Sequence, residues 1–198
     1  FVRRGLHLNT YNAYQSIIRG GHIFLYVRVC DQEIHTHGDK LDLLVCLNQD
    51  TMDRHLQLMG PGSTVLYNGD NITPGEAADG VQMCPLPVAE LSNTRNRLSQ
   101  NTMAVGSAAY LLGLDFEVLE ESLTLRFQRQ GQAVIDENVG VARAGYDHAV
   151  ANFKAFAQTV PTGPKPLAVW SGNDALAMGG AAAGVKFYAA YPMSPATG

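Results

Sequence analysis

A nearly continuous apolar run, Leu-Asp-Leu-Leu-Val-Cys-Leu at residues 41–47, places the tightest limit on how this chain can fold. Such a run is typical of a strand covered on both faces, as in a parallel sheet between two layers of helices. A helix is expected at residues 50–59, the Gly60-Pro61-Gly62 sequence ends it, and a second strand is expected at residues 63–68. This order predicts an α/β fold with a Rossmann-like open, mainly parallel sheet flanked by helices.

The flanking sequence predicts further strands and helices. Two β-branched or aromatic stretches, at residues 6–11 and 22–30, indicate strands, and Pro85 confines the strand at residues 81–86 to a sheet edge. Helices are expected at residues 101–112, at 116–130 with Asp115 as the cap, and at 132–156 with Gly140 and Gly145 as weak points. A small-residue helix from Gly172 onward and a short apolar strand then lead to the end of the chain.

Three prolines and one glycine between residues 159 and 166 disfavour helix and strand, and so indicate a linker. The expected organisation is therefore a first domain at residues 1–157, a proline-rich linker at 158–166, and the beginning of a second α/β domain at 167–198. The chain begins at Phe1 without an initiator Met and ends within the second domain, so we expect a fragment truncated at both ends.

Charge and cysteine content exclude several classes of protein. Fourteen basic residues against eighteen acidic ones give a net charge of -4 with no basic block, so neither a nucleic-acid backbone nor an anionic membrane is an expected partner. No apolar run approaches the roughly 20 residues that span a bilayer. The three cysteines, Cys30, Cys46 and Cys84, lack CxxC spacing, which indicates buried thiols in a reducing, cytoplasmic compartment and no iron–sulfur cluster in this chain.

The last eight residues, Tyr-Pro-Met-Ser-Pro-Ala-Thr-Gly, form a stiff turn around a hydroxyl group. Pro192 and Pro195 lock their own φ angles and drive the preceding residues toward extended geometry. Tyr191 and Ser194 are therefore expected to be held in place at a ligand site.

Several motifs in this order resemble those of one family, the 2-oxoacid:acceptor (ferredoxin) oxidoreductases. The similar subunit is the one in which a gamma domain is fused ahead of a pyrimidine-binding alpha domain. The motifs are Arg19-Gly20-Gly21 with the strand ending Val27-Arg28-Val29; Asp42-Leu43-Leu44-Val45 with Asn48; Pro61-Gly62-Ser63-Thr64-Val65; Asn101-Thr102-Met103-Ala104-Val105-Gly106 with Asn138 and Gly145-Tyr146; and Gly172-Asn173-Asp174-Ala175 with the terminal turn.

The resemblance implies a thiamine diphosphate enzyme. Such enzymes oxidatively decarboxylate a 2-oxo acid, transfer the acyl group to the cosubstrate coenzyme A, and pass electrons through iron–sulfur clusters to ferredoxin. This subunit would share thiamine diphosphate and Mg²⁺ with a partner beta subunit, which would also carry the cluster.

The resemblance also implies roles for particular residues. Ser194 stands where the family usually has Thr, and its hydroxyl would donate to the substrate's carboxyl or keto group. The substrate site is expected to contain Ser194, Tyr191, Pro192 and Arg19, and the cofactor site Gly20, Gly21, Asn101 and Asn173. The Glu that activates thiamine is expected beyond Gly198, so no catalytic residue is assigned, and no metal ligand is expected. The family's opening Gly-rich strand, turn and helix has no counterpart here.

Simpler interpretations of these residues remain open. The Arg19 turn can serve only to join two strands, and Asn101 and Asn173 can be helix caps. The two histidines of His35-Thr36-His37 are expected in a solvated loop rather than at a metal. The alternative function is a non-catalytic Rossmann-like module that binds a ligand or assembles a complex. A nicotinamide-dependent dehydrogenase is disfavoured because no GxGxxG follows a first strand.

Overall fold

The computed structural model describes residues 1–13, 21–92, 97–157, 160, 162–168 and 170–191. The chain forms two compact units. The larger contains residues 9–28 and 35–161, and the smaller contains residues 1–8, 29–34 and 162–198.

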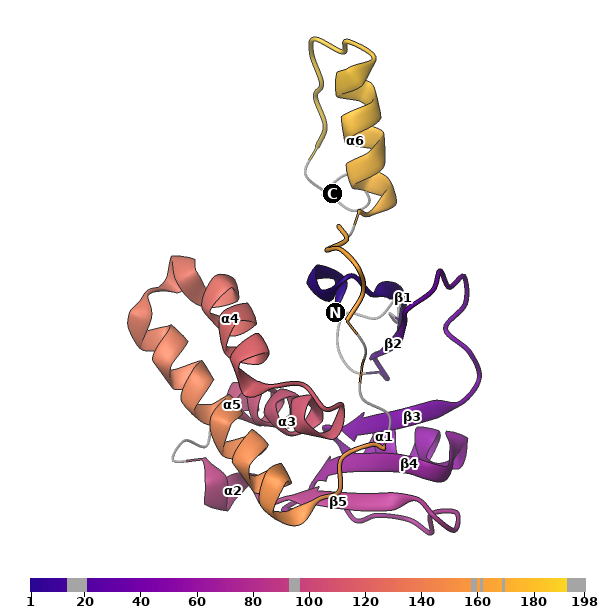
Figure 1. The fold of residues 1–198 in the computed structure, drawn as a ribbon, viewed down its shortest axis with the longest axis vertical. Helices are drawn as coiled ribbons and strands as arrows, with labels where there is room; N and C mark the ends of the chain where they lie inside the picture. Colours follow the sequence, from indigo (N-terminus) through magenta and orange to yellow (C-terminus); the bar gives the residue numbers. More distant parts are fainter. Residues whose placement is uncertain (14–20, 93–96, 158–159, 161, 169, 192–198) are drawn as a thin grey trace. The chain divides into compact units, whose positions relative to one another are not determined.

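A three-stranded parallel sheet forms the centre of the larger unit (Figure 1). Its strands are β3 (Leu41–Cys46), β4 (Met59–Asn68) and β5 (Gln82–Leu86), in that spatial order. Helix α1 (Gln49–His55) and the 3-10 turn η2 (Leu56–Leu58) connect β3 to β4. The register pairs Val45 with Leu66 and Leu66 with Cys84. The predicted strand–helix–strand order and the parallel α/β sheet are therefore confirmed, as is the edge position of the Pro85 strand. The predicted boundary was wrong: α1 ends at His55, and Gly60-Pro61-Gly62 lies inside β4 instead of ending the helix.

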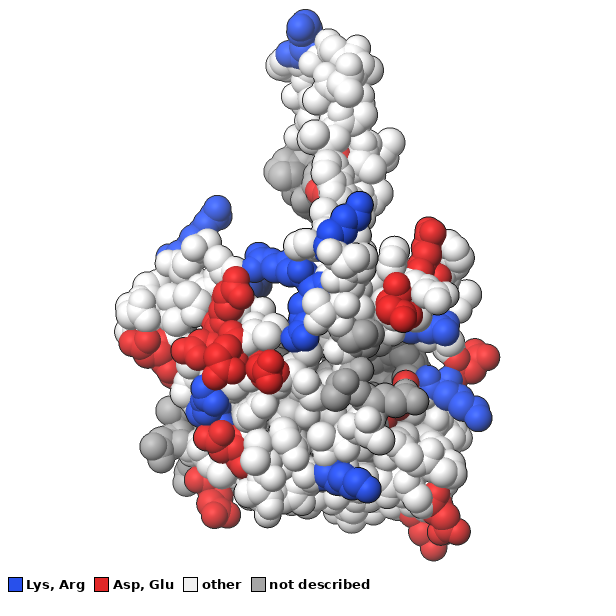
Figure 2. Space-filling model, viewed as in Figure 1, with Lys and Arg blue, Asp and Glu red and all other residues white. Residues whose placement is uncertain are grey.

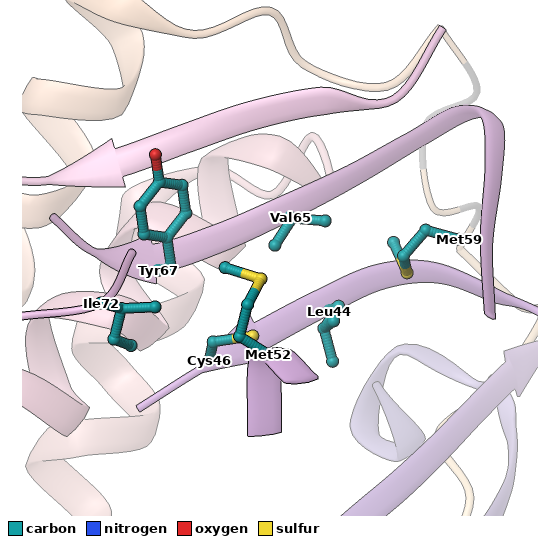
Figure 3. Packing of buried hydrophobic residues seen from close by; sticks show 7 residues of the cluster. All are labelled: Leu44, Cys46, Met52, Met59, Val65, Tyr67 and Ile72. Carbon is teal, nitrogen blue, oxygen red and sulfur yellow. The ribbon is translucent and has the colours of Figure 1, made fainter. Parts of the chain in front are cut away.

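Successive residues of β3 and β4 enter two different hydrophobic clusters, one on each face of the sheet. Figure 3 shows the first, in which Met52 of α1 packs against Leu44, Cys46, Val65 and Tyr67. The second contains Leu66, Cys84 and Leu86 with residues of α3 (Arg97–Leu111), including Met103 and Leu111. Burial on both faces explains why the sequence of β3 is apolar almost throughout.

Helices α3 and α5 (Gln132–Asn152) lie side by side in the larger unit (Figure 1). In the sequence, α4 (Phe116–Phe127) and the 3-10 turn η3 (Gln128–Gln130) lie between α3 and α5, and Gly113, at φ 69°, lies between α3 and α4. The short helix α2 (Val88–Leu91) precedes α3. Asp115 is the N-cap residue of α4, as predicted, although its side chain makes no capping hydrogen bond.

One prediction for this region was wrong. Helix α3 already includes Arg97, so Asn101 lies in its interior and is not a cap. Helix α5 continues through Gly145, whose missing side chain lets the backbone of α3 approach closely.

The two N-terminal strands, β1 (His7–Ala13) and β2 (Phe24–Cys30), pair in a sheet of their own. Both strands were expected from the sequence, although each begins one or two residues later than predicted. The 3-10 turn η1 (Val2–Arg4) precedes them.

In the smaller unit, residues from the expected linker hydrogen-bond to the N-terminal segment. Gly163 donates to the carbonyl of Arg4 at 2.6 Å and Leu167 to that of Val2 at 2.9 Å. Helix α6 (Gly172–Ala182) follows. The strand predicted after it was wrong, because residues 183–191 form no strand. An apolar sequence forms a strand only beside a pairing partner, and Phe187 and Tyr188 are exposed here.

Acidic and basic side chains are interspersed over the larger unit on the face drawn in Figure 2. On α1, the exposed side chains of Asp50 and Arg54, four residues apart, form an ion pair with a Nε to Oδ1 distance of 2.7 Å.

Candidate functional site

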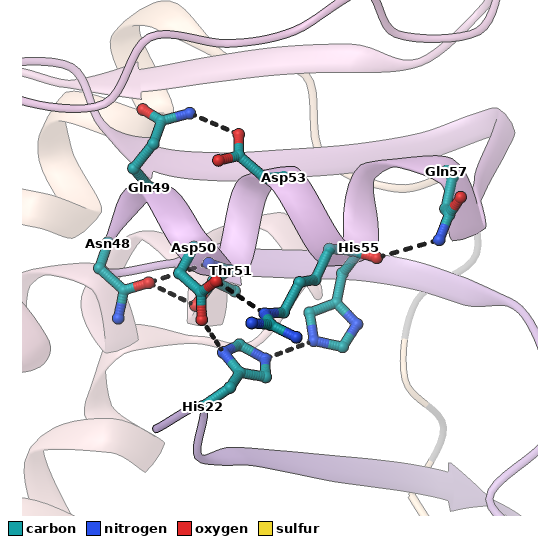
Figure 4. Close-up of polar contacts among 9 residues, drawn as sticks. His22, Asn48, Gln49, Asp50, Thr51, Asp53, His55 and Gln57 are labelled. Atoms are coloured by element: carbon teal, nitrogen blue, oxygen red, sulfur yellow. Dashed lines mark hydrogen bonds and ion pairs between the residues drawn. The ribbon is translucent and has the colours of Figure 1, made fainter. Parts of the chain in front are cut away.

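A group of polar side chains around two buried histidines gathers where α1 meets the beginning of β2 (Figure 4). Asn48 caps α1 by accepting a hydrogen bond from the backbone N–H of Thr51 at 2.9 Å. The cap places Asp50 in the first turn and His55 in the last, and His22 comes from the segment just before β2. The site thus joins two parts of the sequence that are far apart.

His22 contacts α1 through both ring nitrogens. Its Nδ1 lies 3.0 Å from Oδ2 of Asp50, and its Nε2 lies 2.7 Å from Nε2 of His55. Because a carboxylate only accepts, Nδ1 of His22 carries a proton. One more proton fits between the two Nε2 atoms, and the tautomers of the two rings determine which nitrogen carries it.

The electrostatics of the group favour a neutral His55 and an ionised Asp50. Burial lowers the pKa of His55, and the nearby His22 and Arg54 lower it further. The hydrogen bond from Arg54 lowers the pKa of Asp50, assisted by the Arg54 charge and by His22. The carboxylate is thus a permanent acceptor for His22.

Aromatic rings enclose the histidine pair. The ring of Phe24 lies 5.2 Å from that of His22 and 4.9 Å from that of His55, and Tyr26 contacts Phe24 edge-on at 5.1 Å. Tyr11 of β1 and His37 add a stacked pair at 5.1 Å. Both histidines of the pair are less than one-tenth exposed, so the hydrogen bond between them is shielded from water and is expected to be worth more than a surface one.

The predicted site residues fall in different parts of the chain. Arg19, Gly20, Pro192 and Ser194 lie outside the described residues. Gly21 is described, has φ 88°, and directly precedes His22.

The remaining predicted residues are exposed. Asn101 belongs to the larger unit, while Asn173 and Tyr191 belong to the smaller one. Ser171 is the cap of α6, and its hydroxyl and Asp174 form a reciprocal capping box. The interpretation of Asn173 as that cap was therefore wrong.

The histidine pair could not be found from sequence spacing. His22 and His55 are separated by 33 residues, and each is the kind of isolated histidine that occurs in many unrelated positions. Sequence spacing could have indicated one contact of this site, the pair of Asp50 and Arg54, which are one helical turn apart on α1.

The cysteines do not converge on one point in the part of the chain that the structure describes. Cys46 and Cys84 belong to clusters on opposite faces of the sheet. Burial raises the pKa of each thiol to about 12. His35 and His37 lie in the expected exposed loop, where Arg28 donates to the Thr36 hydroxyl at 3.2 Å.

Comparison with known proteins places this fold in a family. The model of the family described as pyruvate ferredoxin/flavodoxin oxidoreductase matches residues 1–148, which is most of the chain. The chain belongs to this family. No helix in the described ranges has both the length and the hydrophobicity needed to cross a membrane.

Individual relatives of this chain agree with the family match. It is 23% identical to the alpha subunit of 2-oxoacid:ferredoxin oxidoreductase 2 of Aeropyrum pernix over 93% of this chain and 36% of the relative. The 2-oxoglutarate:ferredoxin oxidoreductase of Magnetococcus marinus, solved with 2-oxoglutarate, coenzyme A and succinyl-CoA bound, superimposes with a TM-score of 0.85 at 28% identity. That match covers 99% of this chain and 35% of the other.

A third match concerns the fold alone. The gamma subunit of a keto/oxoacid ferredoxin oxidoreductase from Geobacter sulfurreducens matches with a TM-score of 0.55 at 21% identity, over 76% of this chain and 84% of that one. The chain spans about a third of the length of the alpha-subunit relative and of the Magnetococcus chain. These relatives are oxidoreductase subunits, and none of them supports the alternative of a non-catalytic scaffold.

Proposed function

We propose that this chain is part of a subunit of a 2-oxoacid:ferredoxin oxidoreductase. The reaction converts a 2-oxo acid and coenzyme A into acyl-CoA and CO2, and releases a proton and two electrons, which pass to ferredoxin. The observation that carries the proposal is the superposition of nearly the whole chain on an enzyme solved with 2-oxoglutarate, coenzyme A and succinyl-CoA.

The proposed domain organisation is a gamma domain at residues 1–157, a linker at 158–166 and the beginning of a pyrimidine-binding alpha domain at 167–198. The fold likeness to a separate gamma subunit supports the first part. The beta subunit and ferredoxin are the proposed partners. A cytoplasmic location is proposed because Cys46 and Cys84 are free, buried thiols.

Thiamine diphosphate supplies carbanion stabilisation when it is bound. We assign it, with Mg²⁺, to a site shared with the beta subunit, which also holds the iron–sulfur cluster. Asn173 and Tyr191 fit such a site because both are exposed polar groups; Tyr191 is 78% exposed. Ser194 and Pro192 complete the substrate side of this site.

Asp174 does not fit the role of the carboxylate that activates the cofactor. Its Oδ2 accepts hydrogen bonds from the Ser171 hydroxyl at 2.6 Å and the Ser171 backbone at 2.9 Å, and these bonds lower its pKa. A carboxylate that exchanges a proton with a cofactor needs a pKa nearer to neutrality. The activating Glu is therefore still proposed to come from another part of the protein.

In the larger unit, Arg19, Gly20 and Gly21 are proposed to bind a phosphate or carboxylate group of coenzyme A or of the 2-oxo acid. Glycines let backbone N–H groups approach an anion, and Arg offers two parallel donors. Asn101 is a further proposed contact, and its position on the exposed side of α3 leaves its carboxamide accessible.

The test of the proposal uses the full-length protein assembled with its beta subunit under anaerobic conditions. Coenzyme A, a viologen dye and a panel of 2-oxo acids are added, and dye reduction is followed. We expect reduction that requires both coenzyme A and one of the 2-oxo acids. Absence of reduction with pyruvate, 2-oxoglutarate, branched-chain and aryl 2-oxo acids would refute the proposed activity.

Ser194 is tested in the same assay. Ser194→Ala removes the proposed donor and should lower kcat/KM for the 2-oxo acid by about tenfold, the loss of roughly one hydrogen bond. Ser194→Thr keeps the donor and should retain most activity. Ser122→Ala is the matched control, because the Ser122 hydroxyl only bonds the Val118 carbonyl within α4.

A further inference from the structure

A hollow of about 540 Å³ opens at the outer edge of the parallel sheet, between β5 and the end of α5, which lie side by side in Figure 1. This volume is in the range of small-molecule sites. The walls include the apolar side chains of Met83, Pro85, Pro87 and Phe153. The residues that line the hollow all belong to the larger unit. Its size and its walls suit a flat, largely apolar ring.

The open edge of β5 supplies backbone hydrogen-bonding groups to this hollow. Leu86 faces β4, because its carbonyl oxygen accepts from the Gly69 N–H at 2.9 Å. Hydrogen-bonding direction alternates along a strand, so Cys84 also faces β4, whereas Met83 and Pro85 face the edge. In the described part of the chain, β5 pairs with β4 alone. Met83 therefore presents an N–H and a C=O together at the open edge.

The polar side chains of the hollow are richer in acceptors than in donors. Asp70 accepts from the Ala89 backbone N–H through Oδ2 at 2.7 Å, and its Oδ1 accepts from none of the described residues. Asn152 donates from Nδ2 to the His148 carbonyl at 2.8 Å, which leaves its Oδ1 as an acceptor. The His148 ring is the side-chain donor of this group. A matching ligand therefore carries N–H groups on its flat ring.

We propose that this hollow is a binding site for an adenine ring. Adenine carries an amino donor beside a ring-nitrogen acceptor, which matches the C=O and N–H of Met83. The amino group has a second hydrogen, which Oδ1 of Asp70 accepts, while Pro87 and Phe153 cover the ring faces. A base with a carbonyl in place of the amino group would set its oxygen against the carboxylate.

Adenine reaches such an enzyme either as part of coenzyme A or as a free nucleotide, and the chemistry of the ring is the same in both. The link to coenzyme A rests on the proposed function, whereas binding of the ring itself does not. Adenosine is the probe, because it carries the ring without any phosphate.

Calorimetric titration of the full-length protein, assembled with its beta subunit, measures Kd for adenosine and for inosine. The wild type should bind adenosine and discriminate against inosine, which has a carbonyl in place of the amino group. Asp70→Asn keeps an oxygen for the Ala89 N–H and turns the other position into an N–H donor. Adenosine should then bind about tenfold more weakly, and inosine should become the preferred base. Misfolding cannot produce an inverted preference.

Filling the hollow is the second test. Asn152→Trp places a large ring in it and should abolish adenosine binding. Asp147→Trp is the matched control, because it adds the same ring at an exposed position of α5 that does not line the hollow. Absence of adenosine binding to the wild type, or an unchanged base preference in folded Asp70→Asn, overturns the inference.

Titration of coenzyme A and of AMP in the presence of saturating adenosine separates the two sources. Competition with coenzyme A assigns the hollow to the cosubstrate, and competition with AMP alone assigns it to a nucleotide effector. Competition with neither overturns the inference. Because binding is measured without turnover, a complex that binds adenosine but reduces no dye refutes the proposed activity and leaves the adenine site standing.

Discussion

Ser107 of α3 donates a hydrogen bond from its hydroxyl to the carbonyl oxygen of Gly145 in α5 at 2.7 Å. The same hydroxyl also approaches the Met103 carbonyl within its own helix at 3.3 Å. A Cβ atom added at Gly145 would overlap the Met103 carbonyl oxygen, and one added at Gly106 would overlap that of Ala142. The two helices are therefore in backbone contact, which only residues without a side chain permit.

We predict that Gly145→Ala destabilises the protein by about 1 to 3 kcal/mol, because overpacking forces the helices apart. Gly140→Ala is the matched control in the same helix, since a Cβ there meets no atom within 4 Å. That control should gain up to about 1 kcal/mol from better helix propensity. Denaturant unfolding measures both changes, and a Gly145→Ala variant as stable as Gly140→Ala would contradict the packing described here.

The three thiols should differ in reactivity. Cys46 and Cys84 are 1% and 0% exposed, and burial raises the pKa of both to about 12, with Asp53 also raising that of Cys46. Cys30 is partly exposed. Because the thiolate is the reactive form, a disulfide reagent at about pH 8 should modify Cys30 first and the other two only after unfolding. Mass spectrometry of labelled peptides measures the order, and rapid labelling of Cys84 in the native protein would oppose it.

The sequence predicted the fold best where burial alone determines the structure. β3 is apolar because both of its faces are covered, so the sequence predicted β3 and the order β3, α1, β4, although the turn residues Gly60-Pro61-Gly62 lie inside β4 and did not mark the end of α1. The strand predicted after α6 was wrong because pairing depends on a neighbouring strand, which an apolar run does not reveal. The packing role of Gly145 was missed for a similar reason: a helix-weakening residue and a close-packing residue look the same in sequence until the opposing helix is known.

The candidate site shows the same difference between local and long-range information. The motif at Arg19, Gly20 and Gly21 was visible as three adjacent letters. The contact between His22 and His55 was not, because it depends on how α1 packs beside the beginning of β2. Histidines are frequent enough outside sites that no pairing could be chosen among the six in this chain without the fold.

Substitution of Ser171 and of Asn173 should affect helix α6 differently, because only Ser171 caps it. Ser171→Ala removes the hydroxyl that accepts from the Asp174 backbone N–H at 3.1 Å, and should weaken the helix by about 1 kcal/mol. Asn173→Ala should leave the helix intact, because Asn173 lies within the first turn and Ser171 supplies the cap. Amide hydrogen exchange across α6 in the full-length protein measures both. Equal loss of protection in the two variants would assign a capping role to Asn173 after all.

Acid should loosen α1 before it loosens the other helices of the larger unit. Burial and His22 lower the pKa of His55 in the folded protein, so His55 binds a proton more weakly there than in the unfolded chain. Unfolding of this region then takes up a proton, and the stability that neutral His55 contributes is lost as the pH falls below its ordinary pKa of about 6.5. The lowered pKa of Asp50 acts in the same direction, but only near the more acidic range of carboxyl groups.

Hydrogen exchange of a peptide covering α1, corrected for the intrinsic effect of pH, measures this loss between about pH 7 and about pH 5. Protection of α1 should fall across that range relative to α4. In His55→Gln the fall should largely disappear, because the group that takes up the proton is gone. His148→Gln should retain it, since His148 lies on α5 and contacts Phe153 rather than α1. A His55→Gln profile as steep as that of the wild type would mean that another group controls the acid response of α1.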